Sequence, residues 1–155
     1  NWAIVIGHMI GGMVRGLLVG AVVTVIALFF TRLPVNNLFV TVSVLVMTSA
    51  VFSLGGLINA IFARKFDDVS IIPSFVLAPL TYLGGVFYSV SLLPDFAQQL
   101  SLLNPILYMV CAFRFGILGV SDIDIGVAYL IILVFLVGLF SLSLWLINRG
   151  VGIRD

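Results

Sequence analysis

The sequence predicts an all-α fold: a polytopic membrane helical bundle with four transmembrane helices plus a re-entrant helical hairpin before the last one. Three observations lead to this class. Of the 155 residues, 63% are hydrophobic and 8% are charged, whereas about one-quarter of a typical soluble domain is charged. Several uncharged runs reach the roughly 20 residues that a helix needs to cross the ~30 Å hydrocarbon core. Between Pro94 and Gly119, however, two shorter helical patterns meet at Asn104–Pro105.

We expect one transmembrane domain over residues 1–155, with spans at about 9–30, 39–62, 71–92 and 125–147. The first span contains Arg15 near one end, where an arginine side chain can reach the membrane surface. In the same span Gly12, Gly16 and Gly20 stand four residues apart. Because such small-residue spacing lets a neighbouring helix approach closely, we interpret these glycines as a helix contact.

The second and third spans carry similar stripes of small residues: Ser49, Ser53 and Gly56 in the second, Thr81 and Gly85 in the third. Between helices in lipid there is no hydrophobic driving force, so such stripes indicate tight contact faces. A polar lining of a transport path is the alternative interpretation.

Pro79 lies inside the third expected span. Its ring nitrogen carries no hydrogen, so the carbonyl of Phe75 loses its helical donor. Within a membrane that carbonyl needs another donor or water. We therefore expect a local kink at Pro79, beside protein or a wet cavity.

The hairpin is expected at about residues 94–119. Pro94 precedes one short helix, and Asn104 followed by Pro105 is a start signal for a second, with Asn as N-cap and Pro as the first helical residue. The second helix contains Arg114. The two helices would be ~15 Å and ~21 Å long, each shorter than the hydrocarbon core, which favours a re-entrant hairpin over a fifth span.

The distribution of positive charge predicts the orientation. With four spans, one side of the membrane holds Arg64, Lys65, Arg149 and Arg154, against Arg32 and Arg114 on the other. Cytoplasmic loops carry an excess of Lys and Arg. Both ends of the chain are therefore expected in the cytoplasm.

The sequence contains no recognisable constellation of catalytic residues. The chain has a single histidine, His8, and its acidic residues are all aspartate, which excludes the H-E-x-x-H zinc motif. It also lacks a Walker A motif, so we expect no catalytic residue, no metal site and no cofactor in this chain. A net charge of +1 without a basic stripe argues against nucleic-acid binding.

The aspartates lie in expected loops or at the terminus, whereas ion-coupled carriers usually place ionisable groups at mid-depth. Energy for transport would therefore come from outside the membrane, or the role is passive. The charged loop with Arg64, Lys65, Asp67 and Asp68 has two open interpretations. It is either a solvated turn or a contact for a soluble energising subunit.

Several segments resemble one known family in order along the chain. These are GGMVRGLLVG, FDDVSIIPSFVLAPLTYLGGVFYSVSLLP and LNPILYMVCAFRFGILG. They closely resemble the C-terminal half of ABC transporter permeases of the type-2 exporter class, which are bacterial inner-membrane proteins. The resemblance covers essentially the whole chain. It implies six spans per subunit, of which this chain supplies the last four, with the N-terminal part of the family domain missing.

The resemblance also implies partners. In this family two permease copies, here a homodimer, pair with two separate ATP-binding cassette subunits, which hold ATP and Mg²⁺. It places residues 94–119 on the outer side and Asp67 and Asp68 near the ATPase. The expected function is therefore the permease subunit of an ATP-driven exporter of an amphiphilic cargo: a polysaccharide or glycolipid, a lipid, or a drug. The alternative is a non-transporting scaffold or assembly subunit of a larger complex.

Overall fold

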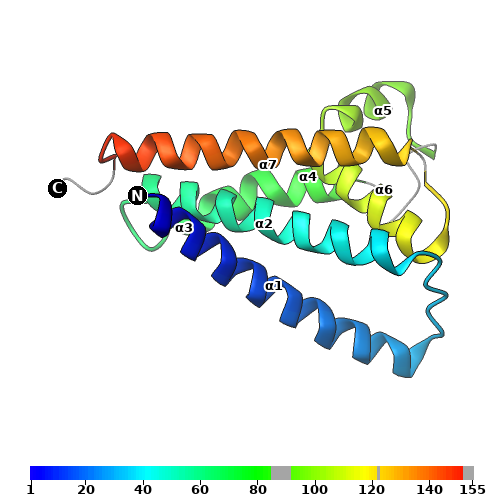
Figure 1. The fold of residues 1–155 in the computed structure, drawn as a ribbon. Coiled ribbons are helices and arrows are strands. Elements are labelled where there is room, and N and C mark those ends of the chain that lie inside the picture. The colour runs from blue at the N-terminus through cyan, green and yellow to red at the C-terminus, as the bar shows by residue number, and fades with distance from the viewer. Residues whose placement is uncertain (85–91, 122, 152–155) are drawn as a thin grey trace.

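The computed structural model describes residues 1–84, 92–121 and 123–151, and every helix and turn in these ranges belongs to one elongated bundle (Figure 1). Three helices are long and apolar enough to cross a membrane: α1 (Trp2–Phe30), α2 (Leu38–Phe62) and α7 (Ile125–Asn148). Two shorter helices, α5 (Asp95–Leu102) and α6 (Pro105–Leu118), form a pair bent by 90°. All regular elements of the described ranges are helical, so the expected all-α polytopic bundle with a bent pair before its last helix is confirmed.

The third expected span, 71–92, is described in its first part only. There the chain forms α3 (Asp68–Ile72), a π-helical turn η1 (Pro73–Leu77) and α4 (Ala78–Leu83). The remainder of this span, with Gly85, lies outside the described residues. At Pro79 the helix continues through a wider turn: the Ala78 N–H donates to the carbonyl of Pro73, five residues back. The π turn thus accommodates the proline ring, which would clash with the carbonyl four residues before it.

Two sets of hydrogen bonds define the two ends of the bundle. At one end, here called the terminal end, the Asn1 side chain donates to the Asn148 side chain at 2.6 Å, which joins the start of α1 to the end of α7. At the other, the turn end, the N–H groups of Asn36 and Asn37 donate to the carbonyls of Ile117 and Gly116. The turn between α1 and α2 is therefore tied to the end of α6 (Figure 1).

These ends show the direction in which residues 68–118 run. The loop at residues 63–67 is at the terminal end with Asn1 and Asn148 (Figure 1), and α6 finishes at the turn end. Residues 68–118 therefore make a net single crossing. Within this crossing, α5 and α6 pass the length and hydropathy test for a span only as a pair, and their 90° bend is that of a broken span or of a re-entrant hairpin.

Helix α2 lies at the centre and packs against α1, α6 and α7. In lipid the helices are held by close van der Waals packing rather than by hydrophobic burial. Small residues allow it: Ala112 of α6 and Ala128 of α7 are fully buried. A methyl group in place of the Gly116 hydrogen would lie 2.9 Å from the backbone nitrogen of Thr41. Gly119 ends α6 with φ +73, a left-handed cap that suits glycine.

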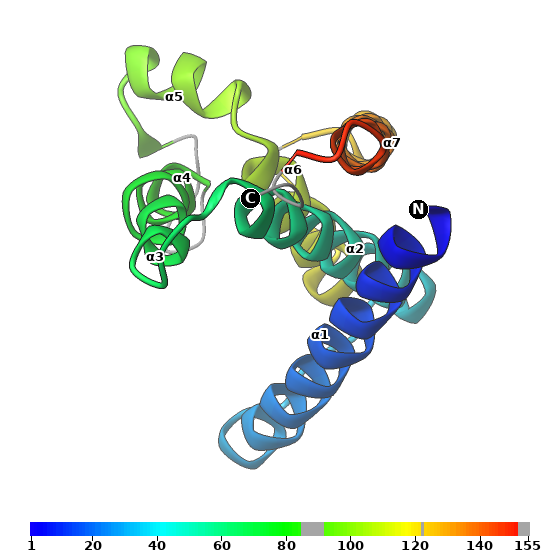
Figure 2. The same cartoon turned by 90° about the vertical axis from the view of Figure 1, so that its left-hand side faces the viewer.

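Helix α1 is packed along one half only. Near its start Val5 is fully buried, and the Trp2 ring meets the Phe140 ring of α7 edge-on at 6.1 Å. Farther along, α1 diverges from the bundle in both views (Figures 1 and 2), and Phe29 and Phe30 at its end are exposed.

Candidate functional site

The small residues of α1 and α2 face each other in antiparallel order. Gly12 lies against Ser53 and Gly16 against Ser49; a methyl group on Gly16 would come within 2.6 Å of the Ser49 hydroxyl oxygen. The Ser53 hydroxyl donates to the carbonyl of His8 at 3.0 Å. The structure thus joins four of the expected packing residues into a single contact.

The other expected packing residues lie elsewhere. Gly20 faces Leu45 of α2, whose side chain would be 3.3 Å from a methyl group added to the glycine. Gly56 is exposed and would meet no atom within 4 Å if it carried a methyl group. Thr81 donates its hydroxyl hydrogen to the Leu77 carbonyl within its own helix at 2.8 Å.

Gly84, which is not among the predicted packing residues, makes the close contact at the end of α4. A methyl group there would lie 2.9 Å from the Ile106 side chain of α6. The Gly84–Gly85 pair in the sequence was the available signal, but the pattern alone does not say which of the two faces a neighbour.

An open hollow of about 380 Å³ lies beside the contact between α1 and α2. It is lined by Arg15, by Val19 and Phe52, and by three hydroxyl-bearing residues of α2: Thr48, Ser49 and Ser53. Ser49 and Phe52, which share this lining, lie in the central part of α2, so Arg15 is at mid-level of that helix and not near one end of a span.

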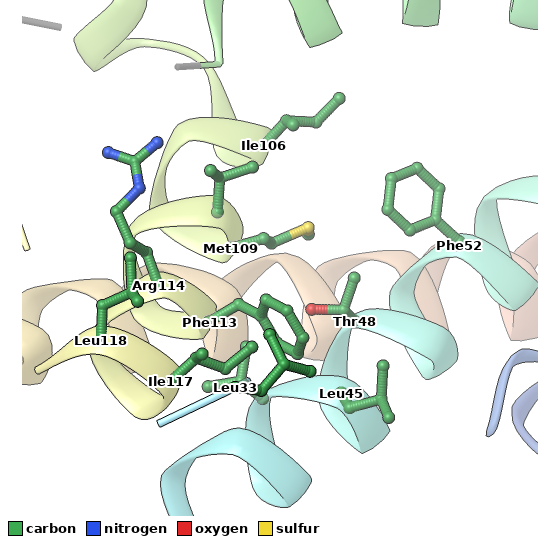
Figure 3. A pocket seen from close by; sticks show the side chains of 12 residues that line it. Leu33, Leu45, Thr48, Phe52, Ile106, Met109, Phe113, Arg114, Ile117 and Leu118 are labelled. Atoms are coloured by element: carbon green, nitrogen blue, oxygen red, sulfur yellow. The ribbon is translucent and has the colours of Figure 1, made fainter. Parts of the chain in front are cut away.

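An apolar pocket of about 540 Å³ lies between α2 and α6 (Figure 3). Phe113 and Thr48 point toward each other across it, whereas the guanidinium of Arg114 points away from Thr48 (Figure 3). Thr48 and Phe52 line both this pocket and the hollow beside Arg15, so the two spaces adjoin along α2. A second apolar cavity of about 280 Å³, lined in part by Gly56 and Pro105, lies among α2, α4, α6 and α7.

The loop between α2 and α3 is held in one shape by Asp68. Its carboxylate accepts hydrogen bonds from the N–H groups of Arg64 at 3.1 Å and Lys65 at 3.0 Å. The buried side chain of Asn59 donates to the carbonyl of Val69 at 2.9 Å, which fixes the start of α3 to the end of α2.

This fixed loop presents Phe66 with 94% of its surface exposed. The charged residues on either side, Arg64, Lys65 and Asp67, are exposed too. The charges alone pointed to this loop, and the prediction did not include the aromatic residue. The sequence did contain a signal for an exposed Phe66, because this aromatic residue stands between two cationic and two acidic residues with no apolar residue beside it.

Asn104 connects the hairpin to α4. Its side-chain oxygen accepts from the N–H of Ile106 at 3.0 Å, as an N-cap does. Its side-chain NH₂ donates to the carbonyl of Leu80 at 2.5 Å. That carbonyl is available because the N–H of Gly84, its partner in a regular helix, bonds to Thr81 instead. Pro94, which precedes α5, and Pro105, the first residue of α6, stand at helix starts.

Within the described residues, then, the chain offers hydroxyls and one arginine at mid-depth, apolar spaces on both sides of α2, and a fixed loop at the terminal end. No three His, Cys, Asp or Glu side chains of the described ranges come close enough to hold a metal ion.

Comparison with known proteins identifies a family and several relatives. The chain is 49% identical over 152 residues to the proteins described as inner membrane transport permease YadH of Escherichia coli K12, Escherichia coli O157:H7 and Shigella flexneri. The match covers 98% of this chain and 59% of each relative, so the chain spans about three-fifths of their length. No solved structure matches. The ABC-2 type transporter family matches residues 1–118, and the chain belongs to that family.

Proposed function

We propose that the chain is part of a permease subunit that moves an amphiphilic cargo out of the cytoplasm across a bacterial inner membrane, driven by a separate ATP-binding cassette subunit. The observation that carries the proposal is membership of the ABC-2 family, together with the close similarity to inner membrane transport permeases. Cargo classes that fit are a polysaccharide or glycolipid, a lipid, and a drug. ATP and Mg²⁺ would be bound by the partner.

The distribution of charge supports a cytoplasmic terminal end. Arg64, Lys65 and Arg149 lie at that end, while Arg32 belongs to the turn end. Positively charged residues are in excess in cytoplasmic loops. The hairpin, whose second helix ends beside the turn at residues 31–37, is then on the outer side.

The loop around Phe66 is the proposed contact for the ATP-binding subunit. An exposed aromatic side chain among charges has the composition of a protein-interaction hot spot, which is rich in aromatic residues. Because Asp68 and Asn59 hold the loop to both α2 and α3, a force on Phe66 would move these helices together rather than bend the loop.

The same contacts suggest how ATP-driven motion reaches the outer side. Movement of α3 passes to α4 through the π turn, where a helix adjusts its winding at low cost. From α4 it passes to α6 through the hydrogen bond between Leu80 and Asn104. The end of α6 is in turn bonded to Asn36 and Asn37, so the hairpin would move with the outer turn.

The cargo path is proposed to lie between two permease copies. The apolar pocket beside Phe113 would hold the apolar part of the cargo, and the diverging half of α1 exposes apolar side chains along its length. Two permease copies would enclose a path for a bulky cargo, which a single small bundle has too few helices to surround.

The test is affinity purification of the full-length permease from native membranes, followed by reconstitution in vesicles. Recovery with an ATP-binding cassette subunit, and ATP-dependent movement of a labelled amphiphile across the vesicle membrane, are the expected results. Repeated purification without such a subunit, or ATP hydrolysis by the complex without movement of any amphiphile, would favour the scaffold or assembly role.

A further inference from the structure

Arg15 lies at the level of the middle of α2, because Ser49 and Phe52, which line the same hollow, belong to the central part of that helix. Its side chain is exposed. A cation at this depth is costly unless an anion or a polar cavity receives it. Arginines at such depths usually face a partner or a water-filled cavity, and Arg15 lines an open hollow together with the hydroxyl-bearing residues Thr48, Ser49 and Ser53.

Among the described residues no carboxylate lines this hollow. The acidic residues of the chain are all aspartate, and the described ones lie in the loop before α3 or at helix starts: Asp67, Asp68, Asp95 and Asp124. No hydrogen bond or ion pair joins Arg15 to another described residue, and its side chain is exposed.

The hollow is built to receive a small polar group beside this cation. Gly12 and Gly16 remove side-chain volume from the α1 wall, and the hydroxyl-bearing residues Ser49 and Thr48 form the wall on α2. A guanidinium is a planar fork that binds phosphate and carboxylate oxygens two at a time. A volume of about 380 Å³ is enough for a head group and too small for a whole lipid.

The neighbouring pocket provides for the rest of such a molecule. Thr48 and Phe52 belong to both linings, and beyond them the 540 Å³ pocket is walled by apolar side chains, among them Leu45 and Phe113. The sequence of spaces along α2 is therefore cation, hydroxyls, aromatic ring, apolar pocket. That order matches a molecule with an anionic head and an apolar tail.

We propose that Arg15 binds the phosphate or carboxylate of an anionic amphiphile, whose apolar part occupies the pocket between α2 and α6. The inference deepens the proposed export function, on which it rests, by giving the cargo a negative charge.

The test measures binding to the full-length permease in nanodiscs of zwitterionic phosphatidylcholine, without ATP. The probes are radiolabelled dodecyl phosphate, dodecanoate and dodecanol, which share a tail and differ in charge. Wild type should bind both anionic probes at least tenfold more tightly than dodecanol. Arg15→Gln should bind all three equally. Arg32→Gln, which removes a cation at the turn end, should behave as wild type.

Two further measurements make every outcome informative. Arg15→Lys keeps the charge and the folding but not the planar fork, so its preference for dodecyl phosphate should fall between those of wild type and Arg15→Gln. Inorganic phosphate should displace dodecyl phosphate only weakly, because it cannot fill the apolar pocket; equal displacement would make the site one for free phosphate and overturn the proposal. An unchanged preference in a folded Arg15→Gln protein would overturn it as well.

A wild-type protein without any preference for the anionic probes would mean that an acidic side chain of another segment or copy neutralises Arg15. That result also overturns the inference. Failure of the proposed function is measured separately, by ATP-driven transport in vesicles. If the permease binds the anionic probes through Arg15 but transports nothing, export alone is refuted. If it transports an amphiphile but shows no binding that depends on Arg15, the anion site alone is refuted.

Discussion

The side chain of Asn104 holds the start of α6 and the carbonyl oxygen of Leu80 in α4 at the same time, with its oxygen turned to one and its nitrogen to the other. Asn104 is 2% exposed, so neither bond can be replaced by bulk water. A buried polar group that loses its partner carries the full cost of desolvation.

Replacing Asn104 should therefore separate the stability lost with the helix cap from the stability lost with the hydrogen bond to Leu80. Asn104→Ala removes the cap and leaves the Leu80 carbonyl unpaired, with an expected total loss of about 2–4 kcal/mol of stability. Asn104→Asp keeps the capping oxygen but removes the donor to Leu80, so it should lower stability and uncouple the hairpin. The measurement is the thermal melting of the full-length protein in detergent, with ATP-driven transport as the second readout. Equal melting of Asn104→Ala and wild type would contradict the structure.

The contact between α1 and α2 predicts opposite effects at two adjacent glycines. In Gly12→Ala the new methyl group would overlap Ser53, whereas Gly11→Ala meets no atom within 4 Å. Overpacking of this kind costs about 1–3 kcal/mol. At an open helical position, replacing glycine by alanine instead gains up to about 1 kcal/mol. Melting temperatures should fall for Gly12→Ala and stay level or rise for Gly11→Ala.

A second substitution checks the geometry of that contact. Ser53→Gly, added to Gly12→Ala, frees the space that the methyl group needs and should restore much of the lost stability. If the double variant melted no higher than Gly12→Ala alone, the Gly12 surface would be packed against something other than Ser53.

Phe66 should be the residue of the charged loop that matters most for the ATP-binding partner. Phe66→Ala is expected to weaken the complex about tenfold or more, which corresponds to ~1.4 kcal/mol. Phe29→Ala is the matched control, because Phe29 is also highly exposed but lies at the turn end. The measurement is recovery of the partner with the tagged permease at graded salt and detergent. Similar recoveries with the two variants would place the contact elsewhere.

The orientation can be tested with single cysteines, because Cys111 is the only cysteine of the chain and is buried. In a Cys111→Ala background, an impermeant thiol reagent should label Arg32→Cys in spheroplasts. Lys65→Cys should be labelled only after the membrane is opened. The reverse pattern would turn the whole bundle over and place the Phe66 loop outside the cytoplasm.

The sequence predicted the helical segments and the bent helix pair because each depends on local signals. Apolar runs of the length of a bilayer crossing indicate spans, and Asn104 followed by Pro105 indicates a helix start whatever surrounds it. The glycine and serine stripes were equally visible. Which stripes contact each other could not be predicted, because the spacing of small residues describes one helix surface and carries no information on the surface that packs against it.

Two features depended on the tertiary structure. The depth of Arg15 follows from the packing of α1 on α2, which sets Arg15 beside Ser49 and Phe52 in the central part of α2. The form of the helix at Pro79 was open as well. Proline excludes a regular hydrogen bond, but a kink and a π turn both satisfy that condition, and only the surrounding packing decides between them.

The hydrogen bonds from Asn36 and Asn37 to the end of α6 have a practical consequence for anyone placing an epitope or a fluorescent reporter in this protein. The short connection after the first helix looks like a natural insertion point, yet lengthening it would unfasten the last turn of the hairpin. A tag there would alter the very segment that it was meant to observe, so labels on the outer surface are better attached as single small probes.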